Sequence, residues 1–150
     1  MDFKSVDEIL DFAIGEEEKA AAFYNDLAGK VDKDHIKKLF LGFAKEEMGH
    51  KAKLMAAKEG KLLKKSEKAI VDLKIGDHLE QVELTTGIDY QDALIVAMKA
   101  EKNAFILYTN LAEKTDDPGL REVLTGLAQE EAKHKLRFEL EYDELVFTEN

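Results

Sequence analysis

The chain contains an internal repeat, and this feature restricts its fold more than any other. Residues 13–56 align without a gap on residues 97–140, a shift of 84 positions, and 14 of the 44 aligned pairs are identical. Both copies carry apolar residues at spacings of three and four, the pattern of helices that bury one face. We therefore predict two similar helical units related by a pseudo-twofold axis.

Each copy of the repeat is predicted to form a helical hairpin. The expected helices lie at about 6–29, at about 34–60, from 90 onward, and from 118 to about 147. The loop inside each pair is only a few residues long, which makes its two helices antiparallel. Ser5 and Glu8 form a capping-box pattern, Asp89 is a predicted N-cap, and Asp117 is an N-cap followed by Pro118.

A segment of about 30 residues separates the two hairpins. That length can run back along a bundle, which would leave the second and third helices parallel, and one long crossover of this kind is the ferritin-like connection. We therefore predict an all-α, ferritin-like four-helix bundle in a single domain, 1–150. Its predicted parts are a first hairpin at about 5–60, a crossover at about 61–89 and a second hairpin at about 90–147. The role of the crossover residues Leu73, Ile75 and Leu79 stays open, and one reading is that they cap the bundle with apolar contacts.

Six polar residues occupy stripe positions where apolar side chains are expected: Glu17, Glu47, His50, Glu101, Glu131 and His134. Two E-x-x-H motifs supply four of them, and residues at i and i+3 share one helix face. The separation from 17 to 47 equals that from 101 to 131, which is 30 residues. One E-x-x-H motif arises often by chance, but its recurrence at repeat-related stripe positions predicts a buried metal site.

The charge of these residues favours a pair of metal ions. Four buried carboxylates need compensation, and a pair of divalent cations would supply it. Oxygen and imidazole donors together suit iron(II), manganese(II) or zinc(II) better than calcium or magnesium. Tyr24 and Tyr108 lie seven residues after Glu17 and Glu101. We expect each tyrosine to donate its hydroxyl to a ligand carboxylate.

Other polar residues are predicted to be solvated. Asp32 and His35 form a D-x-x-H pattern whose repeat partners are Asp116 and Gly119, so the pattern has no second half. His78, in the crossover, has no repeat partner, and both histidines are read as loop or surface residues. The same reading applies to five glutamates near the stripes: Glu16, Glu18, Glu46, Glu113 and Glu130.

Composition excludes several classes of function. The chain has no cysteine, so disulfides, thiolate metal sites and cysteine catalysis are ruled out within it. Its net charge of −10 is unsuited to nucleic-acid binding. No apolar run reaches the roughly 20 residues of a membrane span, and the first residues lack the plan of a signal peptide. We expect a cytoplasmic protein.

The motifs around the six polar residues resemble the rubrerythrin branch of the ferritin-like superfamily. They are Glu17…Tyr24, Glu47-Met48-Gly49-His50, Glu101…Tyr108 and Glu131-Ala132-Lys133-His134. The resemblance implies a non-haem di-iron oxidoreductase with the six residues as ligands, two of the carboxylates bridging the ions. It also implies peroxide or dioxygen as the oxidant, a role in oxidative stress, and a homodimer.

The chain departs from the rubrerythrin pattern in two respects. Full-length rubrerythrins carry a cysteine-ligated iron module, whereas these 150 residues hold no cysteine, so an external donor protein would supply electrons. Rubrerythrins also carry a carboxylate three residues after the third-helix ligand, where this chain has Ala104, mirrored by Ala20. Three alternatives therefore stay open: an iron-handling protein (ferroxidase or storage), a zinc or manganese bundle without redox chemistry, and a purely structural module.

Overall fold

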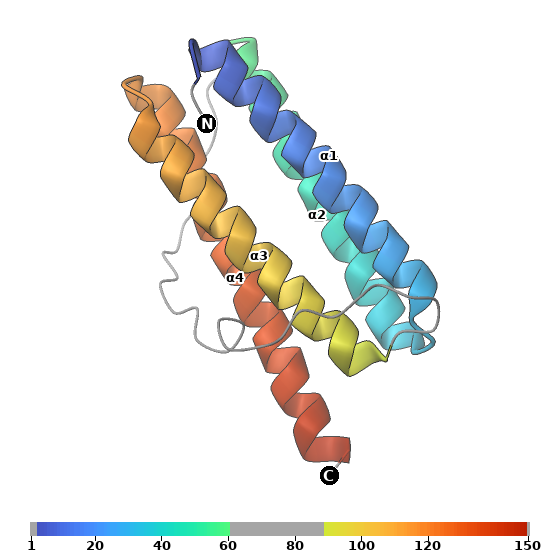
Figure 1. Cartoon of the computed structure of the whole chain (residues 1–150). Helices are drawn as coiled ribbons and strands as arrows, with labels where there is room; N and C mark the ends of the chain where they lie inside the picture. The colour runs from blue at the N-terminus through green and yellow to red at the C-terminus, as the bar shows by residue number, and fades with distance from the viewer. Residues whose placement is uncertain (1–2, 61–88, 150) are drawn as a thin grey trace.

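The computed structural model describes residues 3–60 and 89–149, which contain four α-helices and no strand. The helices are α1 (Val6–Lys30), α2 (Asp34–Lys58), α3 (Tyr90–Lys114) and α4 (Pro118–Glu149). Figure 1 shows two antiparallel pairs, α1 with α2 and α3 with α4, while α2 and α3 run in the same direction. The predicted ferritin-like four-helix bundle of two hairpins is confirmed. The predicted crossover, with Leu73, Ile75, His78 and Leu79, lies outside the described residues.

Helices α1, α3 and α4 begin at the predicted capping residues, and one of the hydrogen bonds there differs from the prediction. Ser5 Oγ accepts a hydrogen bond from Glu8 N at 3.2 Å, as a capping box requires. The Glu8 carboxylate accepts from the backbone N–H of Lys4 rather than that of Ser5, so the reciprocal half of the predicted box is wrong by one residue. Asp89 accepts at 2.8 Å and Asp117 at 2.9 Å from N–H groups in the first turns of α3 and α4. These bonds satisfy donors that a helix start leaves without partners.

The apolar core forms two clusters, one at each end of the bundle. The first contains Tyr24, Phe40, Phe43 and Phe138. The second is built on leucines: Leu54, Leu111, Leu120, Leu124 and Leu127. Along every helix, the predicted polar stripe residues fall between the positions that supply the two clusters. The bundle therefore encloses a polar layer with apolar packing above and below it.

On two helices, the burial of side chains differs from what the apolar periodicity alone predicts. On α2, Leu39 is only half-buried, and its neighbour Phe40 fills the core instead. On α4, Lys135 and Glu139 are buried and form an ion pair with each other across one helical turn. Such a pair is acceptable inside a protein because each charge compensates the other. Among the described helices, none combines the length and the apolar character needed to cross a membrane.

Candidate metal centre

All four helices contribute to one buried cluster of polar side chains. Glu17 lies on α1, Glu101 on α3, and the two E-x-x-H motifs lie on α2 and α4. The cluster consists of the six predicted residues, each at most 5% exposed: Glu17, Glu47, His50, Glu101, Glu131 and His134. The structure thus brings together all six predicted residues, and their role as metal ligands stays a prediction.

His50 faces three carboxylates from three helices. Its Nδ1 atom lies 2.9 Å from Glu131 Oε1, 3.3 Å from Glu47 Oε1 and 3.5 Å from Glu17 Oε1. Since Glu131 comes from α4 and Glu17 from α1, the imidazole of α2 reaches groups in both hairpins. One imidazole nitrogen and three carboxylate oxygens therefore surround a common point.

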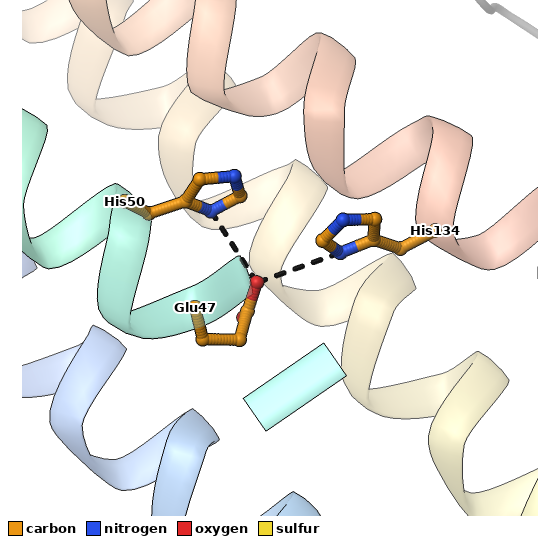
Figure 2. Close-up of side chains that lie close together, drawn as sticks. All are labelled: Glu47, His50 and His134. Carbon is orange, nitrogen blue, oxygen red and sulfur yellow. Dashed lines mark ion pairs between the residues drawn. The ribbon is translucent and has the colours of Figure 1, made fainter. Parts of the chain in front are cut away.

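His134 occupies the equivalent place in the second hairpin. Its Nδ1 atom lies 3.4 Å from Glu47 Oε1, 3.5 Å from Glu101 Oε1 and 3.7 Å from Glu131 Oε1. The rings of His50 and His134 are nearly parallel, with centroids 5.5 Å apart. Figure 2 shows the Glu47 carboxylate between the two imidazoles, with a contact to each.

The six residues form two overlapping groups of four, each with ligand atoms within 4.8 Å of one another. One group contains Glu17 and His50, and the other contains Glu101 and His134. Glu47 and Glu131 belong to both groups. The arrangement can therefore accept a pair of ions, each with one terminal glutamate and one histidine, joined by two shared carboxylates.

A metal fits this site because the cluster leaves one atom of every member without a hydrogen bond. Among the described residues, the buried side-chain atoms that approach one another without forming a hydrogen bond of suitable geometry are Glu17 Oε2, Glu47 Oε1, His50 Nδ1, Glu101 Oε2, Glu131 Oε1 and His134 Nδ1. Buried polar atoms are nearly always hydrogen-bonded in folded proteins. Carboxylate oxygen and neutral imidazole nitrogen both offer lone pairs, which is the donor set that a borderline divalent cation requires.

Two tyrosines hold the terminal glutamates from the opposite hairpin. The hydroxyl of Tyr24 donates to Glu101 Oε1, and that of Tyr108 donates to Glu17 Oε1. Each bond fixes one carboxylate oxygen and leaves the other, Oε2, without a hydrogen bond. The expected donation is present, with the added finding that it crosses between hairpins. Such bonds orient a ligand and restrict its rotation.

The cluster strongly perturbs the ionisation of its own members. Burial raises the pKa of Glu131, and the neighbouring charges of Glu101 and Glu47 raise it further. Burial by itself would lower the pKa of His50, but Glu17 and Glu47 outweigh it and raise the pKa to about 10. For Glu47, burial is outweighed by the two histidines, which hold its pKa at about 2. Without metal, protons on the histidines compensate the carboxylates, and a metal ion has to displace those protons.

Glu46 is solvated, as predicted, with 58% of its side chain exposed, and its carboxylate also contacts a histidine of the cluster. Its Oε2 atom lies 3.3 Å from His134 Nε2, the ring nitrogen that faces away from the cluster. A carboxylate in this place favours the tautomer with the proton on Nε2 and the Nδ1 lone pair directed at the site. The signal was present in the repeat, because Glu46 matches Glu130. Only the packing of α2 against α4 shows which histidine it meets.

His35 lies outside the cluster, as predicted. Its Nε2 atom is 3.3 Å from Glu141 Oε2, and its side chain is 70% exposed. Within the described part of the chain, neither His35 nor Asp32 belongs to a group of residues that could hold a metal ion.

Comparisons with known proteins agree with this geometry. The rubrerythrin family profile matches residues 8–142. The chain is also similar to the solved structure of a hypothetical protein from Pyrococcus furiosus, with a TM-score of 0.65 and 26% identity, covering 97% of this chain and 92% of that one. No curated protein matches the sequence. Since the profile spans most of the chain and includes the whole buried cluster, the chain belongs to the rubrerythrin family.

Proposed function

We propose that this protein binds a pair of iron ions in the buried cluster and reduces peroxide or dioxygen there. The observation that carries the proposal is the convergence of six buried atoms without hydrogen bonds, one from each cluster residue. Membership of the rubrerythrin family supports the same choice of metal. A mixture of carboxylate and imidazole donors suits iron(II), although it also accepts zinc(II) or manganese(II).

The residues divide into terminal and shared ligands. Glu17 with His50 would hold one ion, Glu101 with His134 the other, and both ions would share Glu47 and Glu131. The four carboxylates balance the charge of two divalent cations, so the loaded core would be close to neutral.

Iron held in this way would supply the two electrons that cleave an oxygen–oxygen bond. The chain's own residues would position the ions and shield the site. Burial raises the pKa of Tyr24 and Tyr108 well above the usual value, and Glu101 and Glu17 respectively add to the effect. Both phenols therefore keep their protons and act as hydrogen-bond donors rather than as charged ligands. The apolar clusters shield the polar layer from water at the two ends of the bundle.

Electrons would come from outside these 150 residues, which contain no cysteine to hold an iron–sulfur centre. A one-electron donor protein is the class of partner we propose. The oxidant would be a small molecule, and the reduction of hydrogen peroxide consumes two electrons and two protons and yields two molecules of water.

The test is metal content followed by reaction. Protein expressed with iron and purified without air should contain about two irons per chain. Adding hydrogen peroxide in stoichiometric amount should oxidise the iron within seconds, followed by absorbance, and chemical reduction should restore the starting spectrum. Glu131→Ala should lose both iron and reaction, whereas Glu18→Gln, at an exposed position paired with Lys51, is the matched control.

Other results of this test would indicate a different function. Bound iron that reacts with dioxygen but leaves the protein as ferric ion would indicate a ferroxidase or iron-handling role. Tight binding of zinc or manganese with no uptake of iron would indicate a site without redox chemistry. A chain that binds none of these metals would contradict the proposed site.

A further inference from the structure

A half-open cavity of about 250 Å³ lies between α1 and α3 and ends at the buried cluster. Its floor is formed by the four carboxylates of the cluster together with Tyr24 and Tyr108. Among the described residues that line it, none is a histidine, because both imidazoles approach from α2 and α4. The cavity therefore reaches the proposed ions from the side that the protein's nitrogen ligands leave uncovered.

The walls of this cavity are apolar. They consist of Ala20 and Phe23 on α1 and Ala100, Ala104 and Leu107 on α3. Among the described residues, polar side chains enter the lining through Glu16, Lys19 and Asn103 and at the carboxylate floor. A molecule inside would meet hydrocarbon along its length and oxygen atoms at one end.

The repeat explains why the cavity exists. Ala20 and Ala104 are repeat partners, each three residues after a terminal glutamate and hence on the same helix face. Phe23 and Leu107 are also repeat partners. A larger residue at both alanine positions would fill the space between α1 and α3. The opening is thus encoded symmetrically by two small side chains.

The volume, which includes the space that ions at the carboxylate floor would fill, is much larger than hydrogen peroxide needs. A water molecule requires only about 10–15 Å³ measured in this way, and an apolar cavity of about 150 Å³ holds benzene. Apolar walls also offer no hydrogen bonds to a small polar oxidant. Sites with apolar walls and a few polar groups at one end are typical of binding sites for organic molecules.

We propose that this cavity binds the hydrocarbon part of a small organic hydroperoxide, with the peroxy group directed at the carboxylate floor. The inference rests on the proposed function, since that site would carry out the reduction. The oxygen–oxygen bond of ROOH is cleaved, and ROH and water are released. Two electrons come from the external donor protein through the reduced iron, and two protons come from solvent.

Binding can be tested without turnover, using zinc-loaded protein and cumyl alcohol, the unreactive product of cumene hydroperoxide. The methyl groups of Ala20, Ala100 and Ala104 should shift in NMR spectra of alanine-labelled protein as the alcohol is added. Ala20→Leu combined with Ala104→Leu should weaken binding about tenfold or more, the equivalent of lost contact with about two methylene groups. Ala22→Leu, at an exposed position on α1, is the matched control and should bind normally.

The second test of the cavity proposal measures the kinetics of the iron-loaded protein. The ratio of the rate with cumene hydroperoxide to the rate with hydrogen peroxide should fall about tenfold in the double leucine variant and stay unchanged in Ala22→Leu. Should the double variant fail to fold, Ala104→Ser adds a polar group to the wall without filling it and should lower the same ratio.

The outcomes separate this inference from the proposed function. Normal zinc stoichiometry with no shift of the alanine methyl groups would overturn the cavity proposal and leave the metal site intact. Equal rate ratios in the wild type and the double leucine variant would also overturn it. Failure of the wild-type protein to bind zinc would contradict the metal site. If this zinc-free protein still bound cumyl alcohol, the cavity would remain supported as a binding site for organic molecules.

Discussion

The two hairpins are alike where they would touch metal and different in the next layer of side chains. Glu17, Glu47 and His50 have identical repeat partners in Glu101, Glu131 and His134. Tyr24 and Tyr108 are also partners, and each bonds the terminal glutamate of the other hairpin. Because each ion of a pair needs the same donors, these positions are restricted to the same residues in both halves.

The packing around the two tyrosines is not symmetric. The Tyr24 ring lies 5.8–6.1 Å from the rings of Phe40, Phe43 and Phe138. The repeat partners of these three residues are leucines, and all three belong to the apolar cluster that contains Tyr108: Leu124, Leu127 and Leu54. Phenylalanine and leucine can both make apolar contacts, so these positions need not carry the same residue in both halves of the repeat.

The supports of the two histidines differ as well. Glu46 contacts His134 Nε2, but its repeat partner Glu130 lies 3.5 Å from Lys133 Nζ. The repeat partner of Lys133 is Gly49, which has no side chain to engage Glu46. One substitution beside a ligand thus separates two otherwise equivalent positions. The comparison indicates that the two groups of four contain the same residue types and differ in the side chains around them.

The largest expected effect comes from the ligands that both halves share. Glu47→Ala should abolish binding of both ions, because that carboxylate belongs to both groups of four. Glu17→Ala and Glu101→Ala should each retain about one ion per chain, and to a similar extent, since the two residues are repeat partners. Elemental analysis after anaerobic loading measures this. Equal losses in Glu17→Ala and Glu47→Ala would contradict the distinction between terminal and shared ligands.

Removal of metal should have the next largest effect, on stability. Within each hairpin the backbones approach closely along their length, whereas between hairpins close approaches are few. Ions that join the hairpins should therefore contribute strongly to stability. Binding at a thousandfold excess over Kd adds about 4 kcal/mol, so chelation should lower Tm by about 10 °C. An unchanged Tm after complete metal removal would show that the carboxylates do not need compensation.

The effect of pH on stability should have opposite signs with and without metal. In the metal-free protein the pKa of His50 is raised to about 10, so its stabilising protonation is complete below about 6.5 and is lost as pH rises toward 10. The raised pKa of Glu131 acts in the same direction. Metal-free protein should therefore melt at lower temperature as pH increases from 6.5. Loaded protein should gain stability over pH 5–7, because protons compete with metal.

Much of the fold and the site could be predicted from the sequence because each feature occurs twice, once in each copy of the repeat. The helix stripes, the interruption of those stripes by glutamate and histidine, and the distance of 30 residues between ligands all recur. Helical periodicity then fixes which residues share a face. The tyrosines were predicted as donors to the ligands for the same reason.

Features that depend on the angle between helices could not be predicted in this way. Glu46 is next to a ligand in sequence, but its contact with His134 depends on how α2 meets α4. The burial of Lys135 also gave no sequence signal, since its repeat partner Lys51 is partly exposed and pairs with Glu18. Likewise, Ala104 is a departure from the family pattern that the sequence shows, with Ala20 as its repeat partner, but the cavity that the two alanines border emerged only from the structure.

The smallest expected effect tests the difference between the two histidines. Glu46→Ala should weaken binding of one ion about tenfold, because His134 loses the carboxylate that directs its Nδ1 lone pair at the site. Glu46→Gln keeps an acceptor and should restore part of the affinity. The control is Glu130→Ala, the repeat-related change, which removes a contact to Lys133 and should leave both affinities within about twofold.

Competitive titration of zinc against a chelator separates the two affinities, and the ¹⁵N chemical shifts of the His134 ring report the tautomer directly. A role limited to stability would lower Tm in Glu46→Ala without changing those shifts. Equal weakening by Glu46→Ala and Glu130→Ala would show that both histidines are supported alike, and the asymmetry beside the ligands would then have no consequence for the metal. Greater weakening by Glu46→Ala than by Glu130→Ala would mean that metal binding at the His134 position depends on this carboxylate.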